Sequence, residues 1–447
     1  MHNPYVVGGW VRGPSFYGYT GLIRDLLNGT SDTYWVVSPR RGGKTSLLKE
    51  LERLTLGRGE YVPLYWNLEG LTSGKALSEE LCYAVEDCED RFLEVGIRAS
   101  SLDREDFRAS LRNIARKCRG NNKKLLLLID EPEALIRIGT KEPETLALFR
   151  KTLQGTAGIR TVLASTRLLL TLSTPEDSPT SPFLYGFVRK LLGPMSREDA
   201  EDLMRQTKMP VQVEVSRETA DAIHEATGDQ PYLLQSLCFR LFEPDGYLRH
   251  PEEEDLIPID IVAENFLLNW RFMSPKERKV LLAVAGREPV SEEELAEALG
   301  FNHYELKTIL FSLQVYGCLR HEDGRYSLQN LLLRNWINSK THRTLLENTT
   351  ETLLKDSETE ELVREVGESE VRYLFDRLVA AQKDLLRLQE RKEMFAGYLV
   401  PLPLLRQIEE KEKEIDSIVT SLSRLESLTP ELKAMIDGLV RGEAIAG

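Results

Sequence analysis

A loop rich in glycine and arginine lies between an apolar run and a helical pattern near the start of the chain. The apolar run ends at Val37, the loop follows, and Lys44-Thr45-Ser46 opens the helical pattern. In this order of strand, loop and helix, backbone N–H groups at the helix start can bind phosphate oxygens. The sequence therefore predicts a phosphate-binding loop made of Ser38, Pro39, Arg40, Arg41, Gly42, Gly43, Lys44, Thr45 and Ser46.

The residues of this loop have separate roles in binding a nucleotide. Gly42 and Gly43 lack a Cβ, so the backbone can approach phosphate oxygens closely. Lys44 would reach the outer phosphates, and the Thr45 hydroxyl would be a ligand of Mg²⁺. Ser38 stands where the pattern G-x-x-x-x-G-K-[ST] has its first glycine, and we interpret it as a tolerated variant because serine is small. The alternative, a chance Gly-Gly-Lys-Thr in a surface turn, does not account for the flanking strand and helix.

A second stretch supports the same chemistry. Five apolar residues, Leu125 to Ile129, are followed directly by Asp130 and Glu131. A continuous apolar run suits a central parallel strand buried on both faces, and the carboxyl end of such a strand is where ligands bind. Asp130 would hold Mg²⁺, directly or through water, and Glu131 would polarise the attacking water. For this stretch alone a solvated acidic pair is the alternative, but together with the loop it predicts a nucleotide site.

Size and composition limit the class of protein. At 447 residues the chain is long enough for two to four domains. A net charge of −13 argues against a generally basic nucleic-acid-binding surface, although a local patch stays open. The five cysteines are scattered and the six histidines isolated, so we expect reduced thiols and no zinc site. Because the sequence has no signal peptide and no apolar run of about 18 residues, we expect a cytoplasmic protein with no membrane partner.

Strand and helix patterns alternate over the first 193 residues. Besides the two strands already described, strands are expected at 61–67, 161–166 and 187–192, with helices near 76–95, 103–119 and 143–154. Asp103 is the expected N-cap of the helix at 103–119. The alternation predicts an α/β P-loop NTPase fold, which is a parallel sheet with helices on both faces.

Two strand ends and the N-terminal arm supply further candidates. Ser165 and Thr166 end the strand at 161–166, where a polar residue beside the acidic strand can sense the outer phosphate. Arg189 could meet the phosphate of a neighbouring subunit or be an ordinary surface residue. Val7 and Phe16 could line the adenine pocket, as the preceding arm does in many P-loop ATPases. The alternative is an arm that packs on the sheet.

From Ser196 the pattern becomes helical, which predicts a small helical lid over the nucleotide. Ser196 and Ser216 are each expected to cap a helix with the side-chain hydroxyl. Gly228-Asp229-Gln230-Pro231 interrupts the chain, and Pro231 suits a first helical turn. Pro231 lies in the predicted lid and is a further candidate for nucleotide contact.

Residues 274–330 have the pattern of a winged helix-turn-helix. Three helices, led by Ser274, Ser291 and Asn302, precede a β-hairpin whose turn contains Asp323-Gly324. The region is slightly acidic, so DNA contact and protein contact both stay open. If it binds DNA, the candidate contacts are His303, Lys307, Arg320 and Arg325.

Residues 345–437 are charged and carry a leucine and isoleucine seam typical of a coiled-coil hairpin. This hairpin could also pair between subunits or bind a partner effector protein. The chain is thus expected to have four parts. They are a P-loop NTPase core with an N-terminal arm at 1–193, a helical lid at 194–270, a winged helix at 271–340 and a helical coiled-coil region at 341–447.

These motifs resemble prokaryotic STAND-type NTPases, a branch of the AAA+ class, in a layout similar to that of origin-recognition ATPases. The resemblance covers about residues 3–335, and Gly18-Tyr19 departs from it because such proteins often carry Gly-Arg there. STAND proteins usually add an effector domain and a large repeat sensor, whereas here a short coiled-coil hairpin follows, so we expect one component of a multi-protein system. The resemblance rests on Asn3-Pro4-Tyr5, Phe16-Tyr17-Gly18, Pro39 to Leu48 (Walker A), Leu125 to Glu131 (Walker B), Leu192 to Ser196 and Gly228 to Gln235.

The resemblance implies an ATP-driven switch, of a kind common in bacterial and archaeal defence or signalling systems. ADP would hold the lid and winged helix closed, ATP would open them and permit a homo-oligomer, and slow hydrolysis would reset the switch. ATP must then bind the open state more tightly than the closed one. Two alternatives stay open. One is a DNA-transaction ATPase, similar to origin-binding or transposition loaders, that uses the winged helix on duplex DNA; the other is a non-hydrolysing, nucleotide-stabilised scaffold.

Overall fold

The computed structural model describes residues 2–57, 59–173, 183–258 and 260–339. In the C-terminal part it describes residues 402–423 and the single positions 343, 346, 347, 350, 381, 385, 388, 389 and 392.

Five parallel strands form the central sheet, in the spatial order β2-β3-β4-β1-β5. The strands are β1 (Thr33–Val37), β2 (Tyr61–Asn67), β3 (Lys124–Asp130), β4 (Ile159–Ser165) and β5 (Val188–Leu191). The register pairs Val37 with Ser165 and Asp130 with Ala164, so β1, β4 and β3 end at the same edge of the sheet. The predicted parallel α/β fold of a P-loop NTPase is confirmed.

The helices between these strands differ from the sequence prediction in two places. The helix expected at 76–95 is two helices, α3 and α4, and a helix that the sequence did not suggest, α6, follows the acidic strand. The helices of this part are α1 (Thr20–Asn28), α2 (Lys44–Thr55), α3 (Gly74–Glu86), α4 (Glu89–Leu93), α5 (Phe107–Gly120), α6 (Ala134–Lys141) and α7 (Pro143–Gly155).

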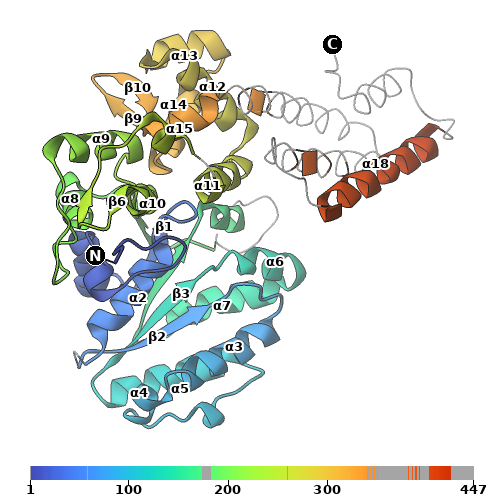
Figure 1. The fold of residues 1–447 in the computed structure, drawn as a ribbon. Helices are drawn as coiled ribbons and strands as arrows, with labels where there is room; N and C mark the ends of the chain where they lie inside the picture. Colours follow the sequence, from blue (N-terminus) through green and yellow to red (C-terminus); the bar gives the residue numbers. More distant parts are fainter. Residues whose placement is uncertain are drawn as a thin grey trace. The chain divides into compact units, whose positions relative to one another are not determined.

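Alternate residues of the strands pack against two separate helical layers. Leu125, Leu127 and Ile129 of β3 belong to the core shared with α3, α5 and α7. Leu126 and Leu128 belong to the core shared with α1 and α2. In Figure 1, α2 lies on one side of β2 and α3, α4 and α5 lie on the other. A strand buried on both faces needs an apolar residue at nearly every position, which explains the continuous run in β3.

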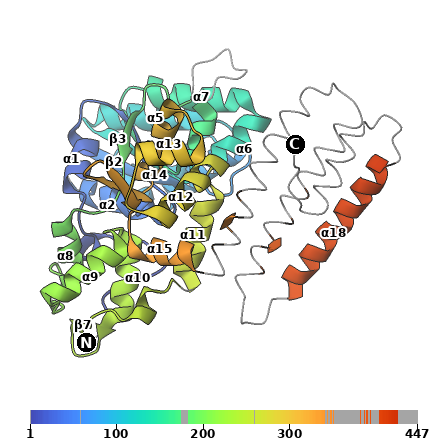
Figure 2. The ribbon, with the colours of Figure 1, turned by 90° about the horizontal axis from the view of Figure 1, so that it is seen from above.

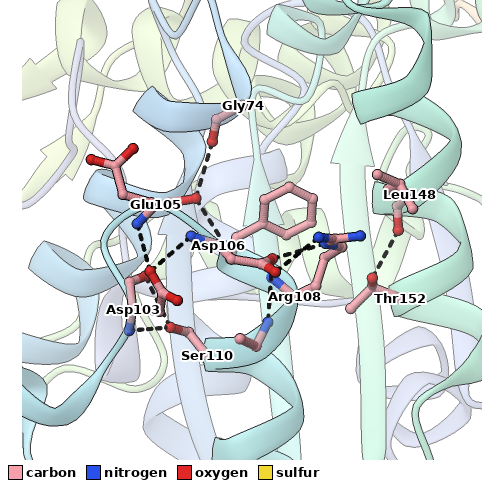
Figure 3. Close-up of polar contacts among 11 residues, drawn as sticks. Gly74, Asp103, Glu105, Asp106, Arg108, Ser110, Leu148 and Thr152 are labelled. Atoms are coloured by element: carbon pink, nitrogen blue, oxygen red, sulfur yellow. Dashed lines mark hydrogen bonds and ion pairs between the residues drawn. The ribbon is translucent and has the colours of Figure 1, made fainter.

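The start of α5 corrects one expectation. Its N-cap is Asp106 and not Asp103, because the Asp106 carboxylate accepts hydrogen bonds from two backbone N–H groups of the first helical turn. The Asp103 carboxylate accepts from two N–H groups in the turn before the helix. Ser110 fixes that turn through hydrogen bonds with the backbone of Asp103, and Figure 3 shows these contacts beside the ion pair of Asp106 with Arg108. Both aspartates suit a cap in sequence, but only Asp106 adjoins the helix.

After β5 the chain is largely helical. Helices α8 (Arg197–Arg205), α9 (Arg217–Thr227) and α10 (Pro231–Leu241) share one core and lie together in Figure 2. The hydroxyls of Ser196 and Ser216 accept the N-cap hydrogen bonds of α8 and α9, so both predicted caps are confirmed. The short strands β6 (Phe242–Glu243) and β7 (Tyr247–Leu248) pair next, and α11 (Asp260–Arg271) follows.

The chain divides into two compact units. We call Met1–Phe272 with Leu310–Trp336 the first unit, and Met273–Ile309 with Ile337–Gly447 the second unit. The four-part domain division predicted from the sequence stays a prediction.

The order of elements after α11 follows the predicted winged-helix pattern, with the short strand β8 in addition. Ser274 and Ser291 cap α12 and α13 through reciprocal capping boxes. Strands β9 and β10 pair antiparallel, and Asp323 and Gly324 have φ angles of 49° and 76°, as a tight hairpin turn requires. The elements are α12 (Pro275–Arg287), β8 (Val290–Ser291), α13 (Glu292–Leu299), α14 (His303–Val315), β9 (Leu319–Glu322), β10 (Arg325–Leu328) and α15 (Leu331–Asn338).

One helix of the predicted C-terminal coiled coil is described, α18 (Leu402–Ser423). Ile408, Ile415 and Ile418 of its apolar seam are buried. In the other predicted helix, Ala381 is buried and Leu385 and Leu388 are half-buried. Leu374, Leu378 and Leu425 lie outside the described residues. Among the residues that the structure describes, no helix combines the length and the apolar character needed to cross a bilayer.

Candidate functional site

The loop between β1 and α2 turns sharply at the edge of the sheet. Arg41 and Gly43 both have positive φ angles, 59° and 93°, and α2 begins at Lys44. For Gly43 this backbone costs little because glycine has no Cβ. The turn delivers the chain to the start of a helix of 12 residues, whose first N–H groups have no partner inside the helix. Loop and helix start therefore have a backbone arrangement in which free N–H groups could bind an anion.

Ser38 occupies the first position of the loop and explains why Gly42 must be glycine. The Ser38 side chain is buried, and its hydroxyl donates a hydrogen bond of 2.7 Å to the Leu192 carbonyl. A Cβ on Gly42 would lie 2.0 Å from Ser38 Oγ, which is far inside van der Waals contact. The serine hydroxyl thus fills the space beside Gly42 and ties the loop to the segment that follows β5.

We expect Gly42→Ala to weaken ATP binding about 10-fold and to lower the unfolding temperature, because the loop must move away from Ser38. Ser38→Gly in the same chain should recover part of both losses, since the clashing oxygen is gone. The recovery is partial because the Pro39 carbonyl also lies 3.1 Å from the added Cβ. Thermal unfolding and ATP titration of the two single variants and the double variant measure this coupling. Additive losses would contradict the proposed clash.

Lys44 is the buried cation of the site. Its side chain is 5% exposed, and its ammonium donates a hydrogen bond of 3.0 Å to the Pro39 carbonyl. Burial lowers the pKa of Lys44, while three nearby carboxylates act in the opposite direction. These carboxylates belong to Glu131, Glu133 and Asp130. A buried cation beside acidic groups is suited to binding the charged phosphates of a nucleotide.

Asp130 connects the two predicted motifs. Asp130 Oδ2 accepts hydrogen bonds from the Thr45 hydroxyl at 2.7 Å and from the Tyr65 hydroxyl at 2.8 Å. Its other oxygen accepts from the backbone N–H of Glu131. A buried carboxylate beside a threonine hydroxyl is a set of hard oxygen donors, which fits Mg²⁺. Asp130 and Thr45 are thus the residues that would hold the ion, with Asp130 acting directly or through water.

Tyr65 positions the carboxylate of Asp130. It lies on β2, and burial, followed by the charge of Asp130, raises the pKa of Tyr65, so its hydroxyl keeps the proton that it donates. The Lys49 ammonium lies 3.3 Å from the centroid of the Tyr65 ring and so holds the ring in place.

We expect Tyr65→Phe to raise the Mg²⁺ concentration needed for half-maximal hydrolysis about 10-fold, because the partners of metal ligands tune metal affinity. The hydrolysis rate at saturating Mg²⁺ should stay within about twofold of the wild-type rate, because the Tyr65 hydroxyl binds Asp130 and is not expected to contact the phosphates. Tyr61→Phe, at the start of the same strand, is the matched control. An unchanged Mg²⁺ dependence in Tyr65→Phe would show that its hydroxyl does not position the metal ligand.

Three polar residues follow the ends of β3 and β4. Glu131 has a φ of 49°, and burial, then the neighbouring charge of Glu133, raises the pKa of its carboxyl. Glu133 Oε1 accepts two hydrogen bonds of 2.6 Å from Thr166, one from its backbone N–H and one from its hydroxyl. Glu133 Oε2 is buried, and no described residue forms a hydrogen bond with it. The ends of β3 and β4 are thus tied together beside Lys44.

The two predicted phosphate sensors have different surroundings. Ser165 Oγ accepts a hydrogen bond of 2.7 Å from the indole N–H of Trp35 and donates one of 2.8 Å to the Thr166 carbonyl. Its side chain is fully buried, whereas the Thr166 hydroxyl is directed to Glu133. Of the two, Thr166 has the more direct connection to the acidic groups of the site.

The remaining nucleotide candidates are spread over the first unit. Phe16 is buried in the core with α1 and α2, and Val7 is half-buried in the arm. Pro231 is the first residue of α10, as expected from the sequence. Ser46 Oγ accepts a hydrogen bond from the arm at Val11, and Arg189 is exposed on the edge strand β5.

The two arginines of the loop lie over aromatic rings of the helical part. The Arg41 guanidinium lies 4.9 Å from the centroid of the Tyr232 ring on α10. The Arg40 guanidinium lies 4.9 Å from that of Phe272, directly after α11. Arg41 thus connects the phosphate loop to the predicted lid, and Arg40 connects it to the start of the predicted winged-helix region.

The four candidate DNA contacts belong to two different units. In the second unit, His303 Nδ1 lies 2.8 Å from a carboxylate oxygen of Glu292, and Lys307 is exposed. In the first unit, Arg320 is half-buried and Arg325 is exposed on β10. The pairing of His303 with a carboxylate makes it a weaker candidate for a phosphate contact.

The sequence patterns did not identify three residues that lie at or beside the site. Tyr65 lies inside β2, so its contact with Asp130 depends on β2 being the neighbour of β3. Glu133 follows the Walker B pair by two residues and could have been suspected from the acidic sequence Asp-Glu-Pro-Glu. Arg167 directly follows Thr166, and no pattern marked it.

Comparison with known proteins identifies the fold. No family model matches the sequence, and no curated protein matches it. Among solved structures, a Walker-type ATPase of Pyrococcus abyssi matches with a TM-score of 0.54 at 14% identity, over 75% of this chain and 99% of that one. At this identity the likeness shows the fold alone.

Two further solved structures match with lower scores. The ORC2 protein of Aeropyrum pernix matches with a TM-score of 0.41 at 16% identity, over 72% of this chain and 93% of that one. A STAND protein with a tetratricopeptide repeat sensor from Pyrococcus horikoshii matches with a TM-score of 0.31 at 14% identity, over 97% of this chain and 62% of that one.

Proposed function

We propose that this chain, which has the fold of a P-loop NTPase, binds ATP with Mg²⁺ and hydrolyses it slowly as a molecular switch. The observation that carries the proposal is the hydrogen bond of 2.7 Å between Thr45 Oγ1 and Asp130 Oδ2. The two residues come from separate motifs, one at a helix start and one at a strand end. Lys44 lies beside them as the cation that the phosphates require.

Different residues of the site bind the nucleotide and promote its hydrolysis. The helix start and Lys44 bind the phosphates, and Thr45 and Asp130 hold Mg²⁺, which when bound neutralises charge on the outer phosphates. Glu131 orients a water molecule for attack on the γ-phosphorus and accepts its proton as the bond to the leaving oxygen breaks. ADP and inorganic phosphate are the products.

The switch follows from contacts between the phosphate loop and the helical part. Arg40 and Arg41 connect the loop to Phe272 and Tyr232, so a change at the phosphates reaches two elements outside the sheet. ATP and ADP shift an equilibrium between two arrangements if they bind those arrangements with different affinity. In the ATP-bound arrangement the chain forms a homo-oligomer. The C-terminal helices are the proposed site for a partner effector protein.

Titration of the wild-type protein with ATP in the presence and absence of Mg²⁺ tests the proposal. We expect saturable ATP binding that Mg²⁺ strengthens, and slow release of phosphate in single-turnover measurements. Absence of ATP binding under both conditions would overturn the proposed function. Binding with no phosphate release would leave the nucleotide-stabilised scaffold as the better account.

A further inference from the structure

We infer that Arg167 couples the nucleotide site to two of the three places where the chain passes between its compact units. The role of ATP in this inference rests on the proposed function, whereas the contacts of Arg167 do not. Arg167 lies directly after Thr166, at the end of β4, and begins a short 3₁₀ helix (Arg167–Ser173). It is therefore the next residue along the chain after the one that binds Glu133.

The Arg167 guanidinium contacts Phe272, Ser312 and Tyr316, which all lie outside the sheet. One nitrogen donates a hydrogen bond of 2.5 Å to the Phe272 carbonyl, and another donates one of 3.2 Å to the Ser312 hydroxyl. The guanidinium carbon also lies 4.5 Å from the centroid of the Tyr316 ring. A planar guanidinium suits this task because its donors point in fixed directions while its face packs on a ring.

These partners lie at two of the three points where the chain crosses between the units, and the third is after Trp336. The chain leaves the first unit after Phe272 and returns to it at Leu310, two residues before Ser312. The Arg167 side chain thus binds Phe272, the last residue before the first of these crossings, and Ser312, in the first helical turn after the second. The backbone N–H of Tyr316 donates a hydrogen bond to the Ser312 carbonyl. The segment that Arg167 contacts therefore keeps a helical hydrogen bond at the end of α14.

A second arginine of the site holds the same residue. Arg40 of the phosphate loop lies over the Phe272 ring, while Arg167 binds the Phe272 carbonyl. The positive charge of Arg40 also acts on Glu131 and Lys44. Phe272 is thus held from the phosphate loop and from the end of β4, the two segments that a γ-phosphate would approach.

The coupling follows from this geometry. Thr166 gives both of its donors to Glu133, and a γ-phosphate beside these groups adds negative charge that competes for the same donors and for Arg40. A displacement at Thr166 moves the backbone of Arg167, because the two residues share a peptide bond. The strength with which Arg167 binds Phe272 and Ser312 then differs between the ATP and ADP states.

Hydrogen exchange of full-length Arg167→Ala measures how strongly Arg167 stabilises the segments around Phe272 and Ser312. Without nucleotide, peptides covering residues 268–275 and 309–317 should exchange about 10-fold faster in Arg167→Ala than in the wild type. Arg112→Ala, which changes an exposed arginine of α5, should leave both peptides unchanged. Tyr316→Leu removes the ring that packs on the guanidinium and should accelerate the same peptides, which keeps the test available if Arg167→Ala does not fold. Exchange as slow as in the wild type would overturn the inference.

A nucleotide comparison tests the coupling itself. In Glu131→Gln, a change intended to keep ATP intact, the two peptides should exchange at different rates with ATP and with ADP. Adding Arg167→Ala should abolish this difference while the ATP dissociation constant changes less than threefold. If ATP binds but the peptides do not distinguish ATP from ADP, the coupling is wrong. If titration shows that ATP does not bind, the proposed function fails, and the nucleotide-free comparison still decides whether Arg167 stabilises the segments around Phe272 and Ser312.

Discussion

Replacement of Lys44 by methionine is expected to weaken ATP binding about 100-fold. A hydrogen bond to a charged group contributes about 1.5–3 kcal/mol, and 1.4 kcal/mol corresponds to a factor of ten in affinity. Lys44 is buried at the start of α2, and no other lysine lies in the loop to replace its charge. Calorimetric titration with ATP and Mg²⁺ measures the loss.

The same variant should fold as stably as the wild type in the absence of nucleotide. Burial lowers the pKa of Lys44, which means that the buried ammonium is disfavoured by desolvation in the folded state. Methionine removes that cost and keeps a side chain of similar length. Lys117→Met, at an exposed position of α5, is the control. Retained ATP affinity in Lys44→Met would contradict the assignment of this loop as the phosphate site.

Replacement of Glu131 by glutamine is expected to slow hydrolysis by about 100-fold to 1,000-fold, within the range typical of general acid–base groups. Glutamine has the same shape but cannot accept the proton of the attacking water. Asp130, Thr45 and Lys44 are unchanged, so the ATP dissociation constant should stay within about threefold. Single-turnover phosphate release and ATP titration separate the two effects.

Glu133→Gln is the matched comparison for Glu131→Gln. Glu133 Oε1 is committed to the two donors of Thr166, so its loss should slow hydrolysis less, by about 10-fold. Both variants remove one negative charge from the same cluster, and a difference between them therefore reports position and not charge. A larger defect in Glu133→Gln than in Glu131→Gln would reassign the water-activating role to Glu133.

The elements that carry the site could be predicted because each has a local signal. The apolar run from Leu125 to Ile129 is long enough to require burial on both faces, and the glycine loop must follow a strand. Ser196 and Ser216 were predicted correctly as caps because the hydroxyl and the N–H groups that it accepts from are close in sequence. Such contacts depend on few residues and need no knowledge of the fold.

The contacts that tune the site could not be predicted because they join distant segments. Tyr65 reaches Asp130 only because β2 and β3 are neighbours in the sheet. The local sequence pattern does not determine the order of the strands. Arg167 contacts Phe272 and Ser312, which are more than 100 residues away along the chain. The N-cap of α5 was assigned to Asp103, although Asp106 takes this role, because two aspartates with equal capping ability lie three residues apart.

We propose that ATP, and not ADP, changes the state of the protein. Light scattering of Glu131→Gln in saturating ATP and in saturating ADP, both with Mg²⁺, tests this proposal. We predict a discrete oligomer with ATP, a smaller species with ADP, and no change with either nucleotide in Lys44→Met. Equal mass in ATP and ADP, with ATP bound in the titration, would contradict ATP-driven assembly.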